Sequence, residues 1–243
     1  MQPGSAKADP LVKNPAAGGG RWVEVPPERL VSWIITFAQR HGGVKGPGSV
    51  VRDGSVVTFT AEDAATAECH PPFPPVPPAE GAPLADEVRG AAEALAAHAA
   101  ADRTIGVLLV RLGGYAVGVF SGSPPRLFDS KTGSRPVHGR SAAGGWSQHR
   151  FARRRDNQAA TAQRVAADAA AEVFGRYGPD RLDAVVLGGD RRSAAGLRDD
   201  ARLEKYLAKA TERFLTVPDP RLAVLREIPR AFLAIRIRLT EPK

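Results

Sequence analysis

The amino-acid sequence predicts an α/β (α+β) protein, in which a mixed sheet with packed helices follows a small N-terminal α/β module. Short β-branched, apolar segments alternate with longer segments whose apolar residues recur at helical spacing. A proline-rich stretch over 71–84 separates two such groups of segments. The second group contains one long predicted helix, over 148–176. These observations predict two domains joined by a linker.

The first domain is predicted over residues 21–70, after a disordered tail over 1–20 that mixes Pro, Gly, Lys and Ala without apolar periodicity. The alternation in Trp22–Val25 predicts a strand. Pro26-Pro27 then opens a helix that ends at His41, because proline suits the first helical turn. The apolar stripe of this helix consists of Leu30, Ile34, Phe37 and Ala38.

A hairpin and a third strand complete this module. Asp53-Gly54 is a strong turn signal between strands over 49–52 and 55–60, and a further strand is predicted over 64–69. The prolines over 71–84 then predict a stiff, extended linker. A proline-rich motif that binds a partner is the alternative, although linkers of this composition are far commoner.

The second domain is predicted over residues 85–243 and opens with an alanine-rich helix over 86–101. An antiparallel meander, a loop over 129–147 and the long helix follow. The strands of the meander are predicted over 104–112, 115–121 and 126–128. Ala162, Val165, Ala166, Ala169 and Val173 are the predicted buried stripe of the long helix. The last elements are a strand over 183–187, a helix over 199–209, a strand over 214–217, a helix over 219–226 and a strand over 232–239.

Composition indicates an anionic partner. The formal net charge is +8 and the pI is about 10.1, which favours RNA binding, although a positive surface can also serve solubility alone. The single cysteine, Cys69, excludes a disulfide within the chain, and the five histidines lack metal-binding spacing, so neither a metal nor another cofactor is expected. No leader peptide and no membrane span are indicated, and a monomeric, cytoplasmic protein is expected.

The most informative segment surrounds the start of the long helix. Residues 141–145 are all small, which allows a loop to enter a narrow space. Ser147 is a suitable N-cap, so Gln148 would lie where helical N–H groups lack internal partners and suit a phosphate or an oxyanion. Trp146 could stack on a base or a ribose, or serve as a core anchor. The predicted cationic patch beside this loop comprises Arg140, Arg150, Arg153, Arg154 and Arg155.

Each of these features has an ordinary structural explanation. A Gly-Gly loop before a capped helix is usually only a connection, and an arginine cluster is often a solvated face. Their combination in a basic chain favours a loop that faces RNA. Physical reasoning does not make Gln148 catalytic, because an amide has no useful pKa and cannot be a general base.

The stretch from Gly144 to Gln158 resembles the motif of the Vms-like release factors, in particular their actinobacterial branch, and the resemblance extends over about 104–239. These proteins are similar to the catalytic middle domain of the eukaryotic and archaeal peptide-chain release factor, where a Gly-Gly-Gln loop enters the peptidyl-transferase centre. Here Trp146 and Ser147 separate the glycines from Gln148. The Vms-like proteins also carry a displaced glutamine, so the resemblance gives the role to Gln148.

The resemblance implies a release-factor-like catalytic domain that hydrolyses peptidyl-tRNA on the large ribosomal subunit of stalled ribosomes. Gln148 would be the catalytic residue, positioning water and stabilising the oxyanion without a metal or a covalent intermediate. Gly144, Gly145, Trp146 and Ser147 would form the supporting loop. The predicted contacts to rRNA and tRNA come from Arg140, His149, Arg150, Arg153, Arg154 and Arg155.

Three alternatives remain open at this point. The chain could cut tRNA near its CCA end, a reaction attributed to some eukaryotic Vms-like proteins, or it could bind the ribosome or tRNA without catalysis. A nuclease using carboxylates would employ Asp190, which follows Gly188-Gly189 at a predicted strand end, with Asp199 and Asp200. The simpler interpretation of these aspartates is that they cap a turn and a helix.

Overall fold

The computed structural model describes residues 14–16, 19–45, 50–52, 55–75, 87–111, 113–134 and 147–242, and only the backbone of 14–15, 50–52 and 147–159. The chain forms two compact units. Unit 1 consists of Met1–Ala100 with Leu233–Lys243, and unit 2 consists of Ala101–Phe232. Within the described parts of the chain, no helix is long and apolar enough to cross a membrane.

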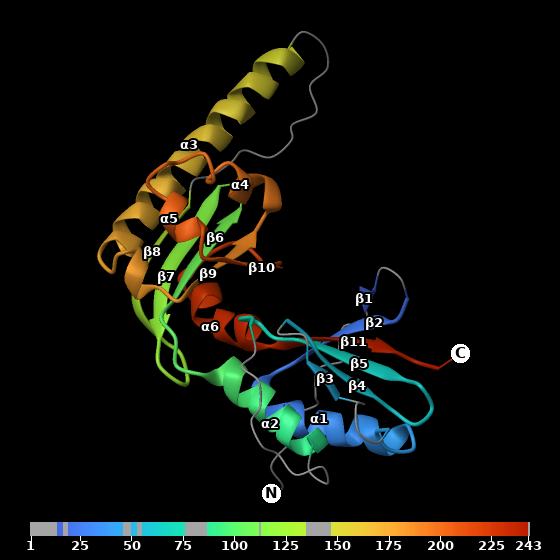
Figure 1. Cartoon of the computed structure of the whole chain (residues 1–243). Helices are drawn as coiled ribbons and strands as arrows, with labels where there is room; N and C mark the ends of the chain where they lie inside the picture. Colours follow the sequence, from blue (N-terminus) through green and yellow to red (C-terminus); the bar gives the residue numbers. More distant parts are fainter. Residues whose placement is uncertain are drawn as a thin grey trace, which may run out of the picture. The chain divides into compact units, whose positions relative to one another are not determined.

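Unit 1 is an antiparallel sheet in the order β1-β2-β11-β5-β4-β3, with two helices packed on one face (Figure 1). The strands are β1 (Asn14–Pro15), β2 (Arg21–Val25), β3 (Val50–Arg52), β4 (Val57–Thr60), β5 (Thr66–His70) and β11 (Ile235–Thr240). The helices are α1 (Pro27–Arg40) and α2 (Glu87–Ala100). Alternate strand residues such as Val23, Phe59 and Ile237 are buried against Ile34 and Leu95 of these helices, as the period of two predicts.

Helix α1 confirms its sequence prediction at both ends. Pro26 is the N-cap and Pro27 the first helical residue, where a missing N–H costs nothing. At the C-terminal end the N–H of Gly43 donates to the Ala38 carbonyl at 2.8 Å. Gly42 there has a φ of +77°, in the left-handed region that favours glycine.

The division of the chain differs from the predicted 21–70 module, 71–84 linker and 85–243 domain. Both α2 and the last strand, β11, belong to unit 1. Strand β11 lies between β2 and β5, with Ile237 opposite Val23 on one side and Cys69 on the other. Such pairing joins residues more than 160 positions apart, so local sequence patterns cannot reveal it.

Unit 2 is a mixed sheet in the order β10-β9-β6-β7-β8, covered on both faces by helices (Figure 1). The strands are β6 (Ile105–Arg111), β7 (Gly114–Ser121), β8 (Arg126–Ser134), β9 (Ala184–Gly189) and β10 (Ala210–Leu215). The helical segments are α3 (Ser147–Gly175), η2 (Pro179–Arg181), α4 (Arg191–Ala195), α5 (Glu204–Leu207) and α6 (Leu222–Leu233). The predicted meander of β6, β7 and β8 is confirmed, with parallel β9 and β10 beside it.

The two faces of this sheet bury different helices. Leu108, Val119 and Val185 share a core cluster with α3 residues. On the other face the ring centroids of Phe120 and of Phe232 in α6 lie 5.7 Å apart, in an edge-to-face arrangement. Unit 2 therefore has three layers, and the apolar face of the sheet is the surface on which α3 packs.

Several elements of unit 2 differ from prediction, among them β10, which begins at Ala210, and α4, which was not predicted. Strand β8 continues to Ser134, because Gly133 leaves room for the Tyr115 ring of β7, which lies within 2.7 Å of where a Cβ would be. The helix predicted over 199–209 shrinks to α5, since the Asp200 carboxylate accepts hydrogen bonds from the backbone and side chain of Arg202. Helix α6 is longer than predicted and includes Pro229.

Gly189→Ala should destabilise unit 2 by about 2 kcal/mol or more, because the change combines backbone strain with a clash. Gly189 ends β9 with a φ of +107°, and an added Cβ would lie 2.0 Å from the Val110 carbonyl oxygen. Urea denaturation of the variant measures the loss. Gly175→Ala is the matched control, because nothing lies within 4 Å of an added Cβ there. Equal stability of the two variants would contradict the argument.

Candidate functional site

The predicted loop leaves the sheet of unit 2 at the edge where its parallel strands end. Ser134, the last residue of β8, pairs with Gly114 at the start of β7, and Gly189 at the end of β9 pairs with Val110. Carboxyl ends of parallel strands are the usual location of sites in open α/β sheets. The chain returns to the described structure at Ser147, as the first residue of α3.

Helix α3 is much longer than the sheet that supports it. Its 29 residues correspond to about 43 Å of helix. Among its described side chains, over 160–175, the buried ones run from Ala166 to Phe174. In Figure 1 the N-terminal part of α3, drawn in yellow, extends past the edge of the sheet. The first turns of α3 therefore project from unit 2.

The predicted site residues fall into two groups. Arg140, Gly144, Gly145 and Trp146 lie outside the described residues. Ser147, Gln148, His149, Arg150, Arg153, Arg154 and Arg155 belong to the projecting part of α3, where the backbone alone is described. The helical prediction is confirmed there, so positions 150, 153 and 154 lie on the same face of the helix by their spacing of three and four.

The C-terminal half of α3 is buried much as its spacing predicts. Ala166, Ala169 and Val173 of the predicted stripe are buried, whereas Ala162 and Val165 are half-buried. Phe174 adds a large side chain that sequence reasoning did not include, and its exposed fraction is 0%. Its ring centroid lies 5.6 Å from that of Tyr206.

An ion-pair network fastens α3 to β8. Glu172 of α3 pairs with Lys131, and Arg176 bonds both oxygens of Asp129 at 3.0 and 2.8 Å and the Glu172 carboxylate at 2.7 Å. The hydrogen bond from Lys131 lowers the pKa of Glu172, and the same bond raises the pKa of Lys131. Lys131, Glu172 and Arg176 are exposed and only Asp129 is half-buried, so the network contributes orientation more than stability.

A second arginine fastens α3 one turn closer to its N-terminus, because Asp168 and Glu172 are four residues apart on the helix. Arg202 bonds Asp168 of α3 at 2.8 Å and Asp200 at 2.7 Å. The hydrogen bond from Arg202 lowers the pKa of the Asp200 carboxyl. Sequence reasoning missed both networks, because their members are far apart in the chain and Lys131 had been placed in a loop. Together the networks fix the direction in which the N-terminal half of α3 projects.

Asp190 serves as a cap, as the simpler interpretation predicts. It is the N-cap of α4, and its carboxylate accepts hydrogen bonds from the Ser193 hydroxyl at 2.8 Å and the Arg192 N–H at 3.2 Å. The Ser193 bond is the main cause of its lowered pKa. Asp199 does not cap a long helix, because α5 begins only at Glu204. No group of three or more His, Cys, Asp or Glu within the described parts of the chain could hold a metal ion.

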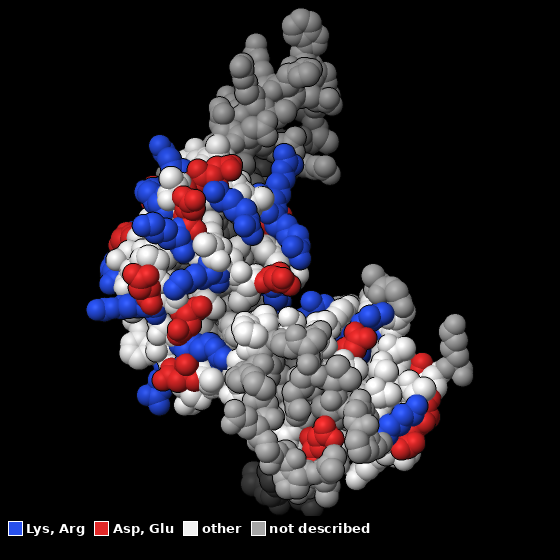
Figure 2. Space-filling view, viewed as in Figure 1, with Lys and Arg blue, Asp and Glu red and all other residues white. Residues whose placement is uncertain are grey.

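The sheet edge also carries arginines that sequence reasoning did not single out. Arg191 and Arg192 follow Asp190 on α4 and are exposed, and the Arg191 guanidinium lies 4.7 Å from the centroid of the Phe214 ring. Arg111 donates to the Val217 carbonyl at 3.0 Å. Figure 2 shows Lys and Arg side chains gathered, among fewer acidic ones, on the visible face of unit 2. These arginines place positive charge at the edge from which the predicted loop departs.

A family comparison covers most of this architecture. Residues 103–238 match the family described as the actinobacteria/chloroflexi VLRF1 release factor. The match runs from the start of unit 2 into β11 and includes the whole stretch from Gly144 to Gln158. A search of curated proteins found no match.

Two solved structures show distant similarity. The crystal structure of the archaeal translation termination factor aRF1 aligns with 87% of this chain at 12% identity and a TM-score of 0.36. A structure described only as an archaeal protein aligns with 85% of this chain at 14% identity and a TM-score of 0.34. The alignments cover 66% and 62% of those chains, so this chain spans less than two thirds of the length of either.

Proposed function

Because the chain belongs to the actinobacteria/chloroflexi VLRF1 release factor family, we propose that it hydrolyses peptidyl-tRNA on stalled ribosomal complexes. The bond broken would be the ester between the nascent peptide and the terminal adenosine of the tRNA. The observation that carries the proposal is the family match across 103–238, which includes Gln148 at the start of a projecting helix.

The position of Gln148 suits this reaction. It is the second residue of α3, and the first N–H groups of an α-helix have no partner within the helix. Those N–H groups and the positive end of the helix dipole can stabilise the oxyanion that forms when water attacks the ester. The side-chain amide can orient the water by hydrogen bonding. No acid–base role is required of the glutamine, which lacks a suitable pKa.

The projection of α3 supports access to a confined substrate. Its N-terminal half extends beyond the sheet, while Arg176 and Arg202 fasten its C-terminal half (Figure 1). A probe of this shape can reach into the ribosome while the body of unit 2 remains outside the reactive centre. The arginines over 150–155 would then follow the RNA backbone, because guanidinium groups match phosphate geometry.

Arg153→Gln combined with Arg154→Gln should weaken binding to large ribosomal subunits and lower the salt dependence of that binding. Each lost phosphate contact reduces the slope of log K against log salt by about 0.7–0.9, so the double variant should lose roughly 1.5. Filter binding at several salt concentrations measures the slope. Arg181→Gln is the matched control, since Arg181 is exposed on η2 at the opposite edge of the sheet. Equal slopes for both variants would argue against an RNA role for this part of α3.

A non-catalytic binding factor would require the same arginines but not Gln148. Cleavage of the tRNA near its CCA end would also free the peptide. These two alternatives differ from ester hydrolysis in the effect of Gln148 substitution and in the nature of the released product.

A further inference from the structure

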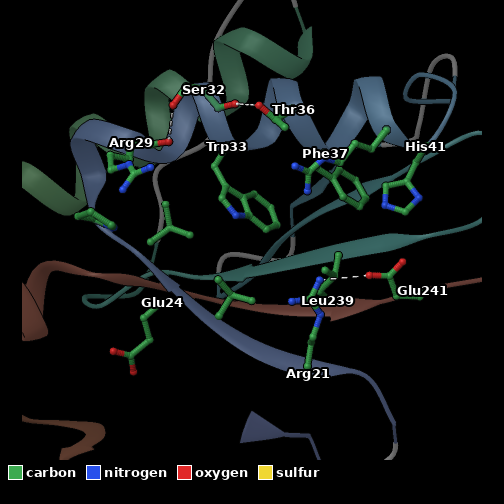
Figure 3. Close-up of a pocket in the computed structure, with 14 residues that line it drawn as sticks. Arg21, Glu24, Arg29, Ser32, Trp33, Thr36, Phe37, His41, Leu239 and Glu241 are labelled. Carbon is green, nitrogen blue, oxygen red and sulfur yellow. Dashed lines mark hydrogen bonds and ion pairs between the residues drawn. The ribbon is translucent and has the colours of Figure 1, made fainter. Parts of the chain in front are cut away.

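Unit 1 contains a groove of about 740 Å³ between α1 and the strands β2 and β11 (Figure 3). This volume lies within the range of small-ligand sites. The groove belongs to unit 1, whereas Gln148 belongs to unit 2.

One stripe of α1 forms the wall of this groove. Arg29, Trp33, Thr36 and Arg40 are spaced by four, three and four residues, which places them along the same helix face. The stripe spans about 16 Å, with an arginine at each end and Trp33 between them. Figure 3 shows the Trp33 and Phe37 rings pointing from α1 toward the strands.

The aromatic part of the groove is both ordered and accessible. The Trp33 and Phe37 rings are stacked, with centroids 5.9 Å apart and an interplanar angle of 2°. Phe37 is buried, whereas Trp33 is only half-buried and so retains exposed ring surface. His41 continues the row, because its ring lies 4.9 Å from Phe37 and its Nδ1 lies 2.8 Å from the Asp63 carboxylate.

The charges of the groove favour an anion. Three arginines and two glutamates line it, and Arg21 is paired with Glu241 at 3.2 Å. Arg29 and Arg40 are exposed, and within the described parts of the chain neither forms an ion pair with a carboxylate. The two cations that flank Trp33 are therefore available to a ligand.

We propose that this groove binds single-stranded RNA, with a base stacked on Trp33 and phosphates held by Arg29 and Arg40. Single-stranded nucleic acid is bound by combining exposed aromatic rings with a positively charged groove that follows the backbone. An apolar peptide would use Trp33 but would leave both arginines without partners. The inference stands on unit 1 alone and does not depend on catalysis by Gln148.

The test is photo-crosslinking and binding of a labelled single-stranded RNA of roughly ten nucleotides, within the site size of single-strand binding modules. The full chain carries Arg153→Gln and Arg154→Gln throughout, so that contacts from α3 contribute little. Crosslinks should map to the α1 peptide. Trp33→Ala should weaken binding on the order of tenfold, and Trp33→Phe should restore most of the affinity because it keeps a stacking ring.

Neutralising the flanking arginines should change the salt dependence of RNA binding, which a purely structural role of these residues would not alter. Arg29→Gln with Arg40→Gln should lower the salt slope by about 1.4, at about 0.7 per lost contact with a single strand. Arg89→Gln is the control, because Arg89 is an exposed arginine of α2 away from the groove. Equal affinity and slope in the groove and control variants, with crosslinks only outside α1, would overturn the proposal. If Gln148→Ala does not affect peptide release, the proposal that the groove binds RNA is unaffected.

Discussion

Gln148→Ala should lower the rate of peptide release from purified stalled complexes by on the order of 10²–10³, with ribosome binding unchanged. That range is the usual loss when one oxyanion-hole donor is removed from an enzyme. Single-turnover release at saturating protein measures the chemical step without the binding step. Undiminished release would exclude a role for the side-chain amide in the reaction.

A second substitution distinguishes the role of the Gln148 side-chain amide from that of its backbone N–H. Alanine removes the side-chain amide but keeps the backbone N–H, whereas proline removes both. Proline is tolerated in a first helical turn, and Gln148 is the second residue of α3. If the side chain performs the chemistry, the two variants should be equally slow. If the N–H stabilises the oxyanion, Gln148→Pro should be much slower than Gln148→Ala.

Gln158→Ala is the matched control for both variants. Position 158 is on the same helix, about 15 Å from position 148 along its axis. Its rate of release should equal that of the unmodified protein. A comparable loss at both positions would indicate that any change in α3 disturbs the reaction, and would remove the special role of Gln148.

The released product identifies the bond that breaks. Ester hydrolysis leaves an intact tRNA that ends in CCA and a peptide with a free carboxylate. Cleavage within the tRNA leaves the CCA nucleotides attached to the peptide. Electrophoresis of both products distinguishes these reactions, and a shortened tRNA would contradict the proposed hydrolysis.

Local signals made much of the fold predictable. The prolines at the start of α1 and the glycines after it placed that helix, and Gly113-Gly114 placed the turn between β6 and β7. The pairing of β11 with β2 and β5 was not predictable, because nothing in the alternation of 235–240 specifies strands so distant in the chain. Strand β11 belongs to unit 1, whereas the sequence prediction includes it in the 85–243 domain.

Only part of the candidate site could be predicted from physical reasoning on the sequence. The start of α3 was predicted to within one residue, since Ser147, the predicted N-cap, is its first helical residue, and the spacing of its arginines followed from helical periodicity. Gln148 followed only from resemblance to a family, since no physical property marks an amide as catalytic. The anchors Lys131 and Asp129 were missed because β8 was predicted to end at Phe128, before either residue.

Phe174→Ala should destabilise unit 2 by about 3–5 kcal/mol, the usual loss for truncating a fully buried phenylalanine. Phe174 joins α3 to the sheet, because its ring lies 3.0 Å from where a Cβ on Gly106 of β6 would be. Urea denaturation measures the change. Arg164→Ala is the control on the same helix, where Arg164 is exposed and a change within about 0.5 kcal/mol is expected. A loss under about 1 kcal/mol for Phe174→Ala would contradict this role.

The same variant tests whether rigid support of α3 matters for function. If the core and the ion pairs serve only to keep unit 2 folded, release by Phe174→Ala should fall in proportion to its folded fraction. If the projecting half of α3 must be held in one direction, release should fall further, because small errors in position are costly in catalysis. Gln148→Ala should show the opposite pattern, with full stability and little release. Excess loss of release in Phe174→Ala, together with loss of release at full stability in Gln148→Ala, is expected only if unit 2 holds α3 in one direction and Gln148 takes part in the reaction.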